Sequence, residues 1–253
     1  MSGHSKWANI KHQKGAADAR RGRIFTKLIR EMTVAVREGG PNPEGNFKLR
    51  LAVQKARDND MPLEHIDRTI KRASGQAEGA ALQEMVLEGY GPGGTAIMVQ
   101  ATTDNRNRTV QEVRAAFTKA GGSLAGAGSV AWLFEQKGVI TVKQNGLNAD
   151  DLMLNAIDAG AEDVKVEHGF VEIYTKPNDL EKVRAALEAK QIPIERAEVS
   201  LEPKQMVQLE EKTALQTLKL LDRLEELDDV QSVASNADFA DTVLEKYQLQ
   251  ASG

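Results

Sequence analysis

Apolar residues recur every three or four positions in the first part of the chain, a spacing that predicts helices. Between residues 16 and 37 they fall on one stripe of a predicted helix, made of Phe25, Leu28, Ile29, Met32 and Val36. The Gly-Gly-Pro run at 39–41 should end this helix. Pro43 suits the first turn of a second helix, which we expect to run to about residue 59. A third helix should start at Met61-Pro62 and end near residue 75. The pattern therefore predicts an all-α module of about 75 residues.

Beyond residue 82 the apolar positions form short runs that are typical of strands. The runs at 85–87 and 96–99 flank the turn sequence GYGPGG, which predicts an antiparallel pair. Asp104 is placed to cap a helix at 106–120, and the run at 130–134 should be the next strand.

Residues 138–202 follow the order strand, helix, strand, strand, helix, strand, which is the split ferredoxin-like plan. The six predicted elements are 139–142, 149–159, 162–167, 170–175, 177–190 and 194–201. After them come a predicted helix at 209–227, a strand at 230–233 and a terminal helix at 238–247. The ββαβ segment at 83–135 has only one helix and three strands. The helix and the strand of this tail would complete it to a similar sandwich with two helices.

We therefore predict an α+β protein with an N-terminal three-helix module and two ferredoxin-like sandwiches, one inserted in the other. The predicted domains are 1–78, a discontinuous domain of 79–136 plus 204–253, and an inserted domain of 137–203. This organisation requires the strand at 230–233 to pair with the sheet of the discontinuous domain.

Positive charge gathers at one end of a chain whose formal net charge is −4. Residues 1–30 hold eight Lys and Arg against the single acid Asp18, and residues 1–75 hold 16 basic against 8 acidic residues. The rest of the chain holds 17 basic and 29 acidic residues. A basic segment on an acidic body favours a polyanionic partner, because dispersed cations bind phosphate backbones by releasing counterions. The charge pattern thus predicts nucleic-acid binding.

Two groups of residues are candidates for this binding. In the first, the cations would contact phosphates while Trp7 stacks on a base or fills a groove. Its members are Lys6, Trp7, Lys11, Lys14, Arg20, Arg21, Arg23, Lys27 and Arg30. The alternative is a solvated charged face with a terminus that docks by burying Trp7. The second group is Arg106, Asn107 and Arg108, where a strand gives way to a helix N-terminus that favours anions. Ordinary helix capping with exposed arginines is the alternative there.

Other chemistry finds little support in the sequence. The chain has no cysteine and four histidines, none of which shows metal-ligand spacing. Neither glycine-rich stretch has the context of a phosphate-binding loop, and the pairs Glu210-Glu211 and Asp228-Asp229 are interpreted as solvated charge. We expect no catalytic residue, metal, cofactor or small-molecule substrate. The absence of an apolar stretch of about 20 residues or of a secretory signal predicts a cytoplasmic protein without membrane contact.

Several strings along the chain resemble one known family. They are GHSKWANIKHQK, GRIFTKLIREM, DMPLEHIDRTIKRASG, EGYGPGGTAIMV, TTDNRNRT, GSVAWLF and LDDVQSVASNAD, running from residue 3 to residue 238. They are similar to the YebC/PmpR family, relatives of a mitochondrial translational activator of cytochrome c oxidase. Asp60, where the family usually has Asn, and the LAGAG loop at 124–128 are mild departures.

The resemblance implies a cytoplasmic three-domain DNA-binding transcriptional regulator. It also implies an alternative, a ribosome-associated translation factor that binds rRNA and assists difficult peptide-bond formation. Both functions suit the charge pattern, because DNA and rRNA both present phosphates. No sequence signal for a helix-turn-helix recognition helix supports base-specific readout.

Overall fold

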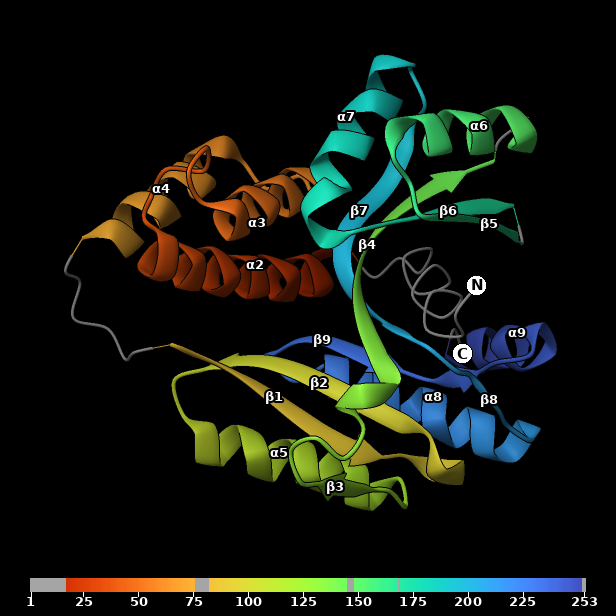
Figure 1. The fold of residues 1–253 in the computed structure, drawn as a ribbon. Coiled ribbons are helices and arrows are strands. Elements are labelled where there is room, and N and C mark those ends of the chain that lie inside the picture. The colour runs from red at the N-terminus through yellow and green to blue at the C-terminus, as the bar shows by residue number, and fades with distance from the viewer. Residues whose placement is uncertain (1–16, 76–81, 145–147, 168, 252–253) are drawn as a thin grey trace. The chain divides into compact units, whose positions relative to one another are not determined.

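The computed structural model describes residues 17–75, 82–144, 148–167 and 169–251 (Figure 1). These residues divide into two compact units. Residues 134–204 form one unit, and the described residues before 134 and after 204 form the other.

Three helices open the described chain: α2 (Ala17–Gly39), α3 (Phe47–Asp58) and α4 (Leu63–Ser74). Their core contains Leu28, Met32, Leu49 and Ile66, so the predicted stripe of α2 does face its neighbours. Ile29 is the exception, because it remains 37% exposed at the edge of the stripe. The three-helix module is confirmed.

The start of the second helix was predicted wrongly. Pro43 lies in a turn before α3, and Asn46 is the N-cap residue. The Asn46 side chain accepts a hydrogen bond from the Leu49 amide at 3.1 Å and donates to the Ala35 carbonyl at 2.7 Å. A cap residue that also ties back to α2 decides where this helix starts, and Pro43 only shapes the approach.

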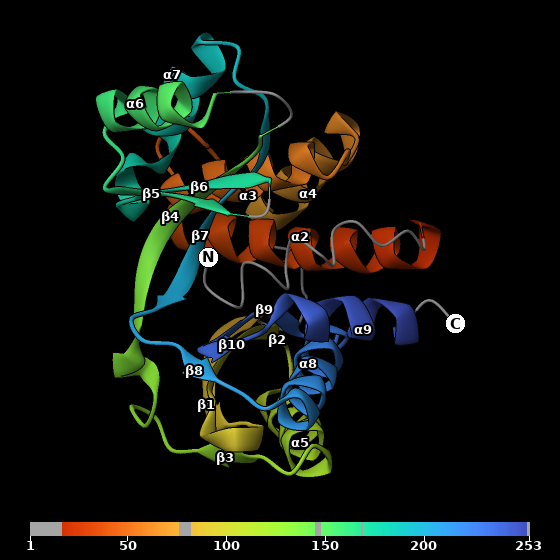
Figure 2. The same ribbon diagram turned by 90° about the vertical axis from the view of Figure 1, so that its right-hand side faces the viewer.

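A four-stranded sheet organises the rest of this unit. Its order is β3-β1-β2-β9, built from β1 (Gln83–Tyr90), β2 (Ala96–Thr103), β3 (Ser123–Ala125) and β9 (Val230–Ser235), with antiparallel neighbours throughout. Helices α5 (Arg106–Lys119) and α8 (Glu211–Glu225) pack against the sheet around Phe117, Leu218 and Leu221. Helix α9 (Asp241–Ala251) packs against α8, and β8 (Val207–Gln208) pairs with β10 (Ala237–Asp238) (Figure 2).

The predicted strand at 230–233 lies within β9, where Val233 pairs with Val99 of β2. The tail of the chain therefore completes the sheet that starts at residue 83, as the α+β organisation requires. The domain bounds themselves stay a prediction.

Two local predictions for the segments around this sheet were wrong. The N-cap of α5 is Asn105 rather than Asp104, because the Asn105 side chain accepts from the Arg108 amide at 3.1 Å. The apolar run at 130–134 is not a strand: residues Ala131–Leu133 form a short 3₁₀ turn, and β3 lies earlier, at 123–125. An apolar run of five residues does not distinguish a strand from a turn that buries only some of its side chains.

The other unit has the predicted βαββαβ order. Its elements are β4 (Phe134–Lys143), α6 (Ala149–Ala159), β5 (Asp163–Glu167), β6 (Phe170–Thr175), α7 (Leu180–Ala189) and β7 (Ile194–Pro203). The strand order β5-β6-β4-β7, with antiparallel neighbours, is that of a ferredoxin-like sheet. The α+β fold class is confirmed.

Candidate nucleic-acid interface

The candidate residues of the basic segment differ in how far the structure describes them. Lys6, Trp7, Lys11 and Lys14 lie outside the described residues. Arg20 belongs to α2, but its side chain also lies outside the description. The remaining candidates are Arg21, Arg23, Lys27 and Arg30 on α2, and Arg106, Asn107 and Arg108 on α5.

Arg21 and Arg23 are exposed on the first turns of α2. Arg21 donates to the Asp60 carbonyl at 3.2 Å, and its guanidinium lies 5.4 Å from the centre of the Phe25 ring. Arg23 has no hydrogen bond or ion pair to the described part of the chain. Its charge is therefore available to an external anion.

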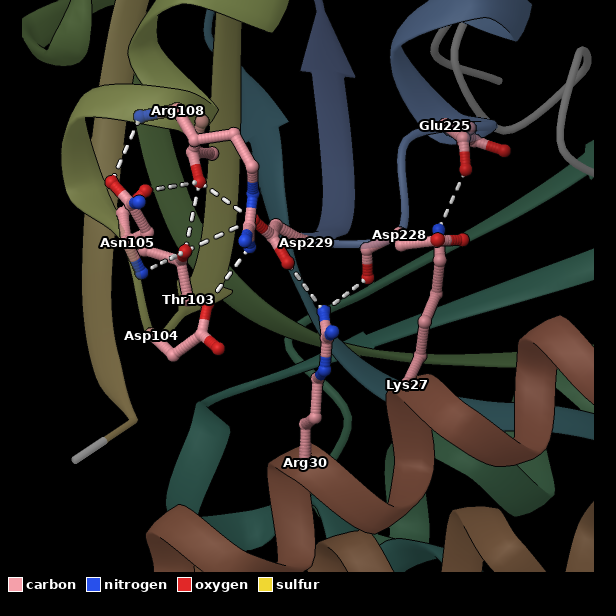
Figure 3. Close-up of polar contacts among 10 residues, drawn as sticks. Lys27, Arg30, Thr103, Asp104, Asn105, Arg108, Glu225, Asp228 and Asp229 are labelled. Atoms are coloured by element: carbon pink, nitrogen blue, oxygen red, sulfur yellow. Dashed lines mark hydrogen bonds and ion pairs between the residues drawn. The ribbon is translucent and has the colours of Figure 1, made fainter. Parts of the chain in front are cut away.

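Lys27 instead contacts the end of α8, and Arg30 contacts the segment that joins α8 to β9 (Figure 3). The Lys27 ammonium donates to the Glu225 carbonyl at 2.6 Å, at the C-terminal end of α8. A cation there is favourable because the last carbonyls of a helix lack intrahelical donors. The Arg30 guanidinium donates to the Asp228 carbonyl at 2.7 Å and to the Asp229 carboxylate at 2.6 Å.

Asp229 is the centre of this arrangement, and only 2% of it is exposed. Arg30 approaches one carboxylate oxygen, and Arg108 donates to the other at 2.7 Å (Figure 3). The hydroxyls of Thr103 and Thr109 donate to the same oxygen as Arg108, at 2.9 and 2.7 Å. One buried carboxylate thus joins the end of β2, the first turn of α5 and helix α2.

The electrostatics of the cluster favour the charged form of Asp229. Burial alone would raise the pKa of its carboxyl group. Hydrogen bonds from Arg108, Thr109 and Thr103 and the charge of Arg30 outweigh burial and lower this pKa from 3.8 to about 2. The contacts of Arg108 with Asp229 and Asp104 raise the pKa of its guanidinium in turn.

Arg106 and Asn107 lie on the same turn of α5 but are exposed, and neither has a hydrogen bond or ion pair to the described residues. Arg108, two positions later, is held by Asp104 and Asp229. The second candidate group therefore separates into one arginine that stabilises the fold and a neighbouring Arg-Asn pair that faces solvent.

The interpretation of Asp228-Asp229 as solvated charge was wrong for one of the two. Asp228 is exposed, whereas Asp229 is buried among four side-chain donors. Nothing in the local sequence distinguishes these neighbouring acids, because the donors to Asp229 come from α2, β2 and α5.

Glu88 on β1 is a second buried carboxylate, 7% exposed, that the sequence did not single out. It accepts the backbone N–H of Gly128 at 2.6 Å, of Val130 at 2.7 Å and of Ala131 at 3.0 Å. Burial opposes its ionisation, but these donors outweigh burial and lower its pKa. Glu88 thus fixes the loop at 126–133. Gly128 in this loop has a φ of +82°, a left-handed backbone conformation that favours glycine.

Within the described residues, no group of three or more His, Asp or Glu side chains is arranged to hold a metal ion. No helix in that part of the chain is both long and apolar enough to cross a membrane.

Models of known protein families match most of the chain and identify the family to which it belongs. Residues 5–76 match the model of the TACO1/YebC N-terminal domain, and residues 82–237 match that of the TACO1/YebC second and third domain. The chain belongs to the TACO1/YebC family. The strings that suggested a resemblance therefore do mark a family relationship.

Relatives of this TACO1/YebC protein match it over nearly its whole length. A "probable transcriptional regulatory protein" of Dehalococcoides mccartyi is 60% identical over 99% of this chain and 100% of the relative. One of Chloroflexus aggregans is 52% identical over 98% and 99% of the two chains. The crystal structure of a conserved hypothetical protein from Aquifex aeolicus has a TM-score of 0.82 at 49% identity, covering 90% of this chain and 95% of that one.

Proposed function

We propose that this protein is a nucleic-acid-binding regulator of gene expression that acts on DNA in the cytoplasm and has no catalytic activity of its own. The concentration of cations in residues 1–30 of an acidic chain carries the proposal. The names of the relatives as transcriptional regulatory proteins support it.

Within the interface, the structure divides the cations by their contacts. Lys27, Arg30 and Arg108 have partners inside the protein, and so they would add little to binding unless those contacts open. Arg23 and Arg106 are exposed without such partners. We therefore assign the phosphate contacts to Lys6, Lys11, Lys14, Arg23 and Arg106, with Arg20, Arg21 and Asn107 as neighbours.

Replacing Lys6, Lys11 and Lys14 together by Ala should weaken binding to duplex DNA and make it less dependent on salt. Each lost phosphate contact removes about 0.9 from the slope of log K against log salt concentration, so the slope should flatten by about two to three. The triple variant Lys176→Ala, Lys182→Ala and Lys219→Ala is the matched control, because it removes the same charge from exposed positions of the acidic part. Equal slopes for the two variants would exclude the basic segment from the interface.

Arg106 and Arg108 provide a comparison between neighbouring arginines of one helix turn. Arg106→Ala should flatten the salt slope by about one and leave the melting temperature unchanged, because the side chain is exposed and has no hydrogen bond or ion pair to the described residues. Arg108→Ala should lower the melting temperature, because it removes a donor to Asp229. Fluorescence-anisotropy titrations and thermal melts measure both effects. A lower melting temperature for Arg106→Ala, with a flatter salt slope but an unchanged melting temperature for Arg108→Ala, would refute this division of roles.

DNA as the ligand is tested by crosslinking in living cells, with sequencing of both the DNA and the RNA recovered. We expect DNA to predominate. Predominant recovery of ribosomal RNA, with co-sedimentation on ribosomal subunits, would instead establish the translation alternative.

A further inference from the structure

One face of helix α5 consists of polar side chains that have no partner in the described part of the chain. Asn107, Gln111, Arg114 and Thr118 are all exposed and follow one another at intervals of three or four residues. This spacing puts them on one side of the helix, as a polar stripe that runs from the first turn to the last. None of the four side chains has a hydrogen bond or ion pair to the described residues. Their donors and acceptors are therefore open to an external ligand.

Two other helices fill their exposed faces differently. Glu64 and Arg68 pair across one turn of α4, and Arg223 and Glu226 do so on α8. Such pairs of opposite charge are the ordinary content of a solvated helix face. The polar stripe of α5 holds no acid and hence no such pair. It consists instead of two amides, a guanidinium and a hydroxyl, which are groups that form directed hydrogen bonds.

Helix α5 is also positively charged in a part of the chain that is acidic. Residues 106–119 hold four basic residues and one acid, Glu112, whereas the whole chain after residue 75 holds 17 basic and 29 acidic residues. Glu112 lies roughly 100° around the helix from Gln111, away from the polar stripe. Arg106 lies in the first turn, where a cation opposes the helix dipole and does not stabilise the helix. The charge of α5 therefore suits a polyanionic ligand.

The opposite side of α5 is fixed to the sheet (Figure 1). Thr109, Val113 and Phe117 are completely buried there. Arg108 and Thr109 also donate to the buried Asp229 carboxylate, which holds the first turn in place. A helix that is ordered in this way before binding loses little conformational entropy when its outer face contacts a ligand. The polar stripe is thus presented with fixed spacing.

We propose that α5 enters the major groove of duplex DNA and that Asn107, Gln111 and Arg114 read base edges there. The groove is about 12 Å wide and admits one α-helix. In it, Arg donates to the O6 and N7 atoms of guanine, and Asn or Gln bonds to the N6 and N7 atoms of adenine. The inference rests on the proposed function and deepens it, because it names the element that distinguishes one DNA sequence from another.

The length of the polar stripe sets the size of the expected site. Residues 107–118 extend about 16 Å along the helix axis, which is the length of roughly five base pairs. Arg106 and Arg114 then have different tasks on one helix. A phosphate contact by Arg106 contributes to salt dependence without sequence preference, whereas a base contact by Arg114 contributes preference without a change in salt dependence.

Selection from a library of random-sequence duplexes tests whether the protein reads bases. The full-length wild type should enrich a motif of about four or five base pairs that contains a guanine. Arg114→Ala should bind the selected duplex roughly five- to 150-fold more weakly and lose the preference for that guanine, with an unchanged salt slope. Arg106→Ala is the matched control, because it removes the same charge from the same helix. It should keep the motif and flatten the salt slope by about one.

A modified base tests the contact itself. The base 7-deazaguanine lacks the N7 acceptor but still pairs with cytosine. At the selected guanine it should weaken binding of the wild type and of Arg106→Ala, and it should not affect Arg114→Ala, which has no side-chain donor for N7. Gln111→Ala is an independent check. It should lose the preference for one adenine, and 7-deazaadenine at that position should weaken the wild type alone.

The outcomes separate this inference from the proposed function. If the wild type binds duplex DNA but enriches no motif, or if Arg114→Ala and Gln111→Ala enrich the wild-type motif, α5 does not read bases while the proposed function stands. An equal effect of 7-deazaguanine on the wild type and on Arg114→Ala would overturn the contact as well. Binding to RNA but to no duplex DNA would refute a helix in the major groove. If the wild type binds no nucleic acid in dilute buffer, the proposed function itself fails.

Discussion

Replacing Asp229 by Asn should lower the free energy of unfolding by about 2–4 kcal/mol, because a buried carboxylate that serves two arginines is lost. For a protein of this size that corresponds to a fall in melting temperature of roughly 5–15 °C. Asn has nearly the same shape as Asp, so packing is preserved. Its amide nitrogen, however, must replace one oxygen and will face donors: Arg30 on one side, or Arg108 with two threonine hydroxyls on the other.

Asp228→Asn is the matched control for this experiment. Asp228 is the neighbouring residue, carries the same side chain and is exposed, and Arg30 contacts only its backbone carbonyl. The control should melt within a degree or two of the wild type, since surface substitutions change stability by at most about 0.5 kcal/mol. Equal stability of the two variants would mean that Asp229 does not hold the unit together.

The same carboxylate should contribute to acid sensitivity. Its pKa is about 2 in the folded protein, against 3.8 ordinarily, so its stabilising effect is complete above pH 4 to 5 and is lost as the pH falls toward 2. The shift corresponds to about 2 kcal/mol. In denaturant titrations across this pH range, the difference in stability between the wild type and Asp229→Asn should therefore shrink as the pH is lowered.

Replacing Glu88 by Gln should release the loop at 126–133 from β1. The three backbone N–H groups would lose a charged acceptor, and the new amide would direct its own N–H groups at some of them. We expect the free energy of local opening of this loop to fall by about 2–3 kcal/mol. The amides of Gly128, Val130 and Ala131 should therefore exchange roughly 30- to 150-fold faster. Hydrogen-exchange mass spectrometry over this loop measures the change.

Glu84→Gln is the control on the same strand. Glu84 is half exposed and forms an ion pair with Lys48 at 3.2 Å, an interaction that contributes little at a protein surface. Exchange in the 126–133 loop should be the same in this control as in the wild type. If Glu88→Gln also leaves exchange in that loop unchanged, Glu88 does not anchor it.

The regular elements of the fold were predictable because each carries its own periodic pattern. The stripe through Leu28, Met32 and Val36 located α2, and alternating strand and helix patterns located the βαββαβ unit. Even the membership of β9 in the sheet that contains β1 and β2, more than 120 residues earlier, followed from counting which sheet lacked a strand. Such predictions succeed when local pattern and tertiary packing agree.

Most of the failures concern residues whose role depends on contacts distant in sequence. Asn46 is fixed by α2, Glu88 by a loop some 40 residues later, and Asp229 by donors from α2, β2 and α5. Trp132 was assigned to a strand, because an apolar run does not show which of its members remain exposed. The candidate interface was consequently predicted as a set of charges. The sequence did not separate the cations that have partners inside the protein from those that are exposed.

That division gives the basic residues of α2 two different tasks. Lys27 and Arg30 join the helical module to the end of α8 and the start of β9, whereas Arg23 is exposed on an earlier turn. Counting positive charges would therefore overestimate the number of phosphates this protein neutralises. The salt dependence of binding counts only the positive charges that contact the ligand.

The salt dependence of duplex DNA binding by the full-length wild type tests the central claim most directly. If Lys6, Lys11, Lys14, Arg23 and Arg106 each neutralise one phosphate, log K should fall linearly with log salt concentration at a slope of about −4 to −5. A slope between zero and −1, or no binding at the lowest salt concentration, would contradict the account.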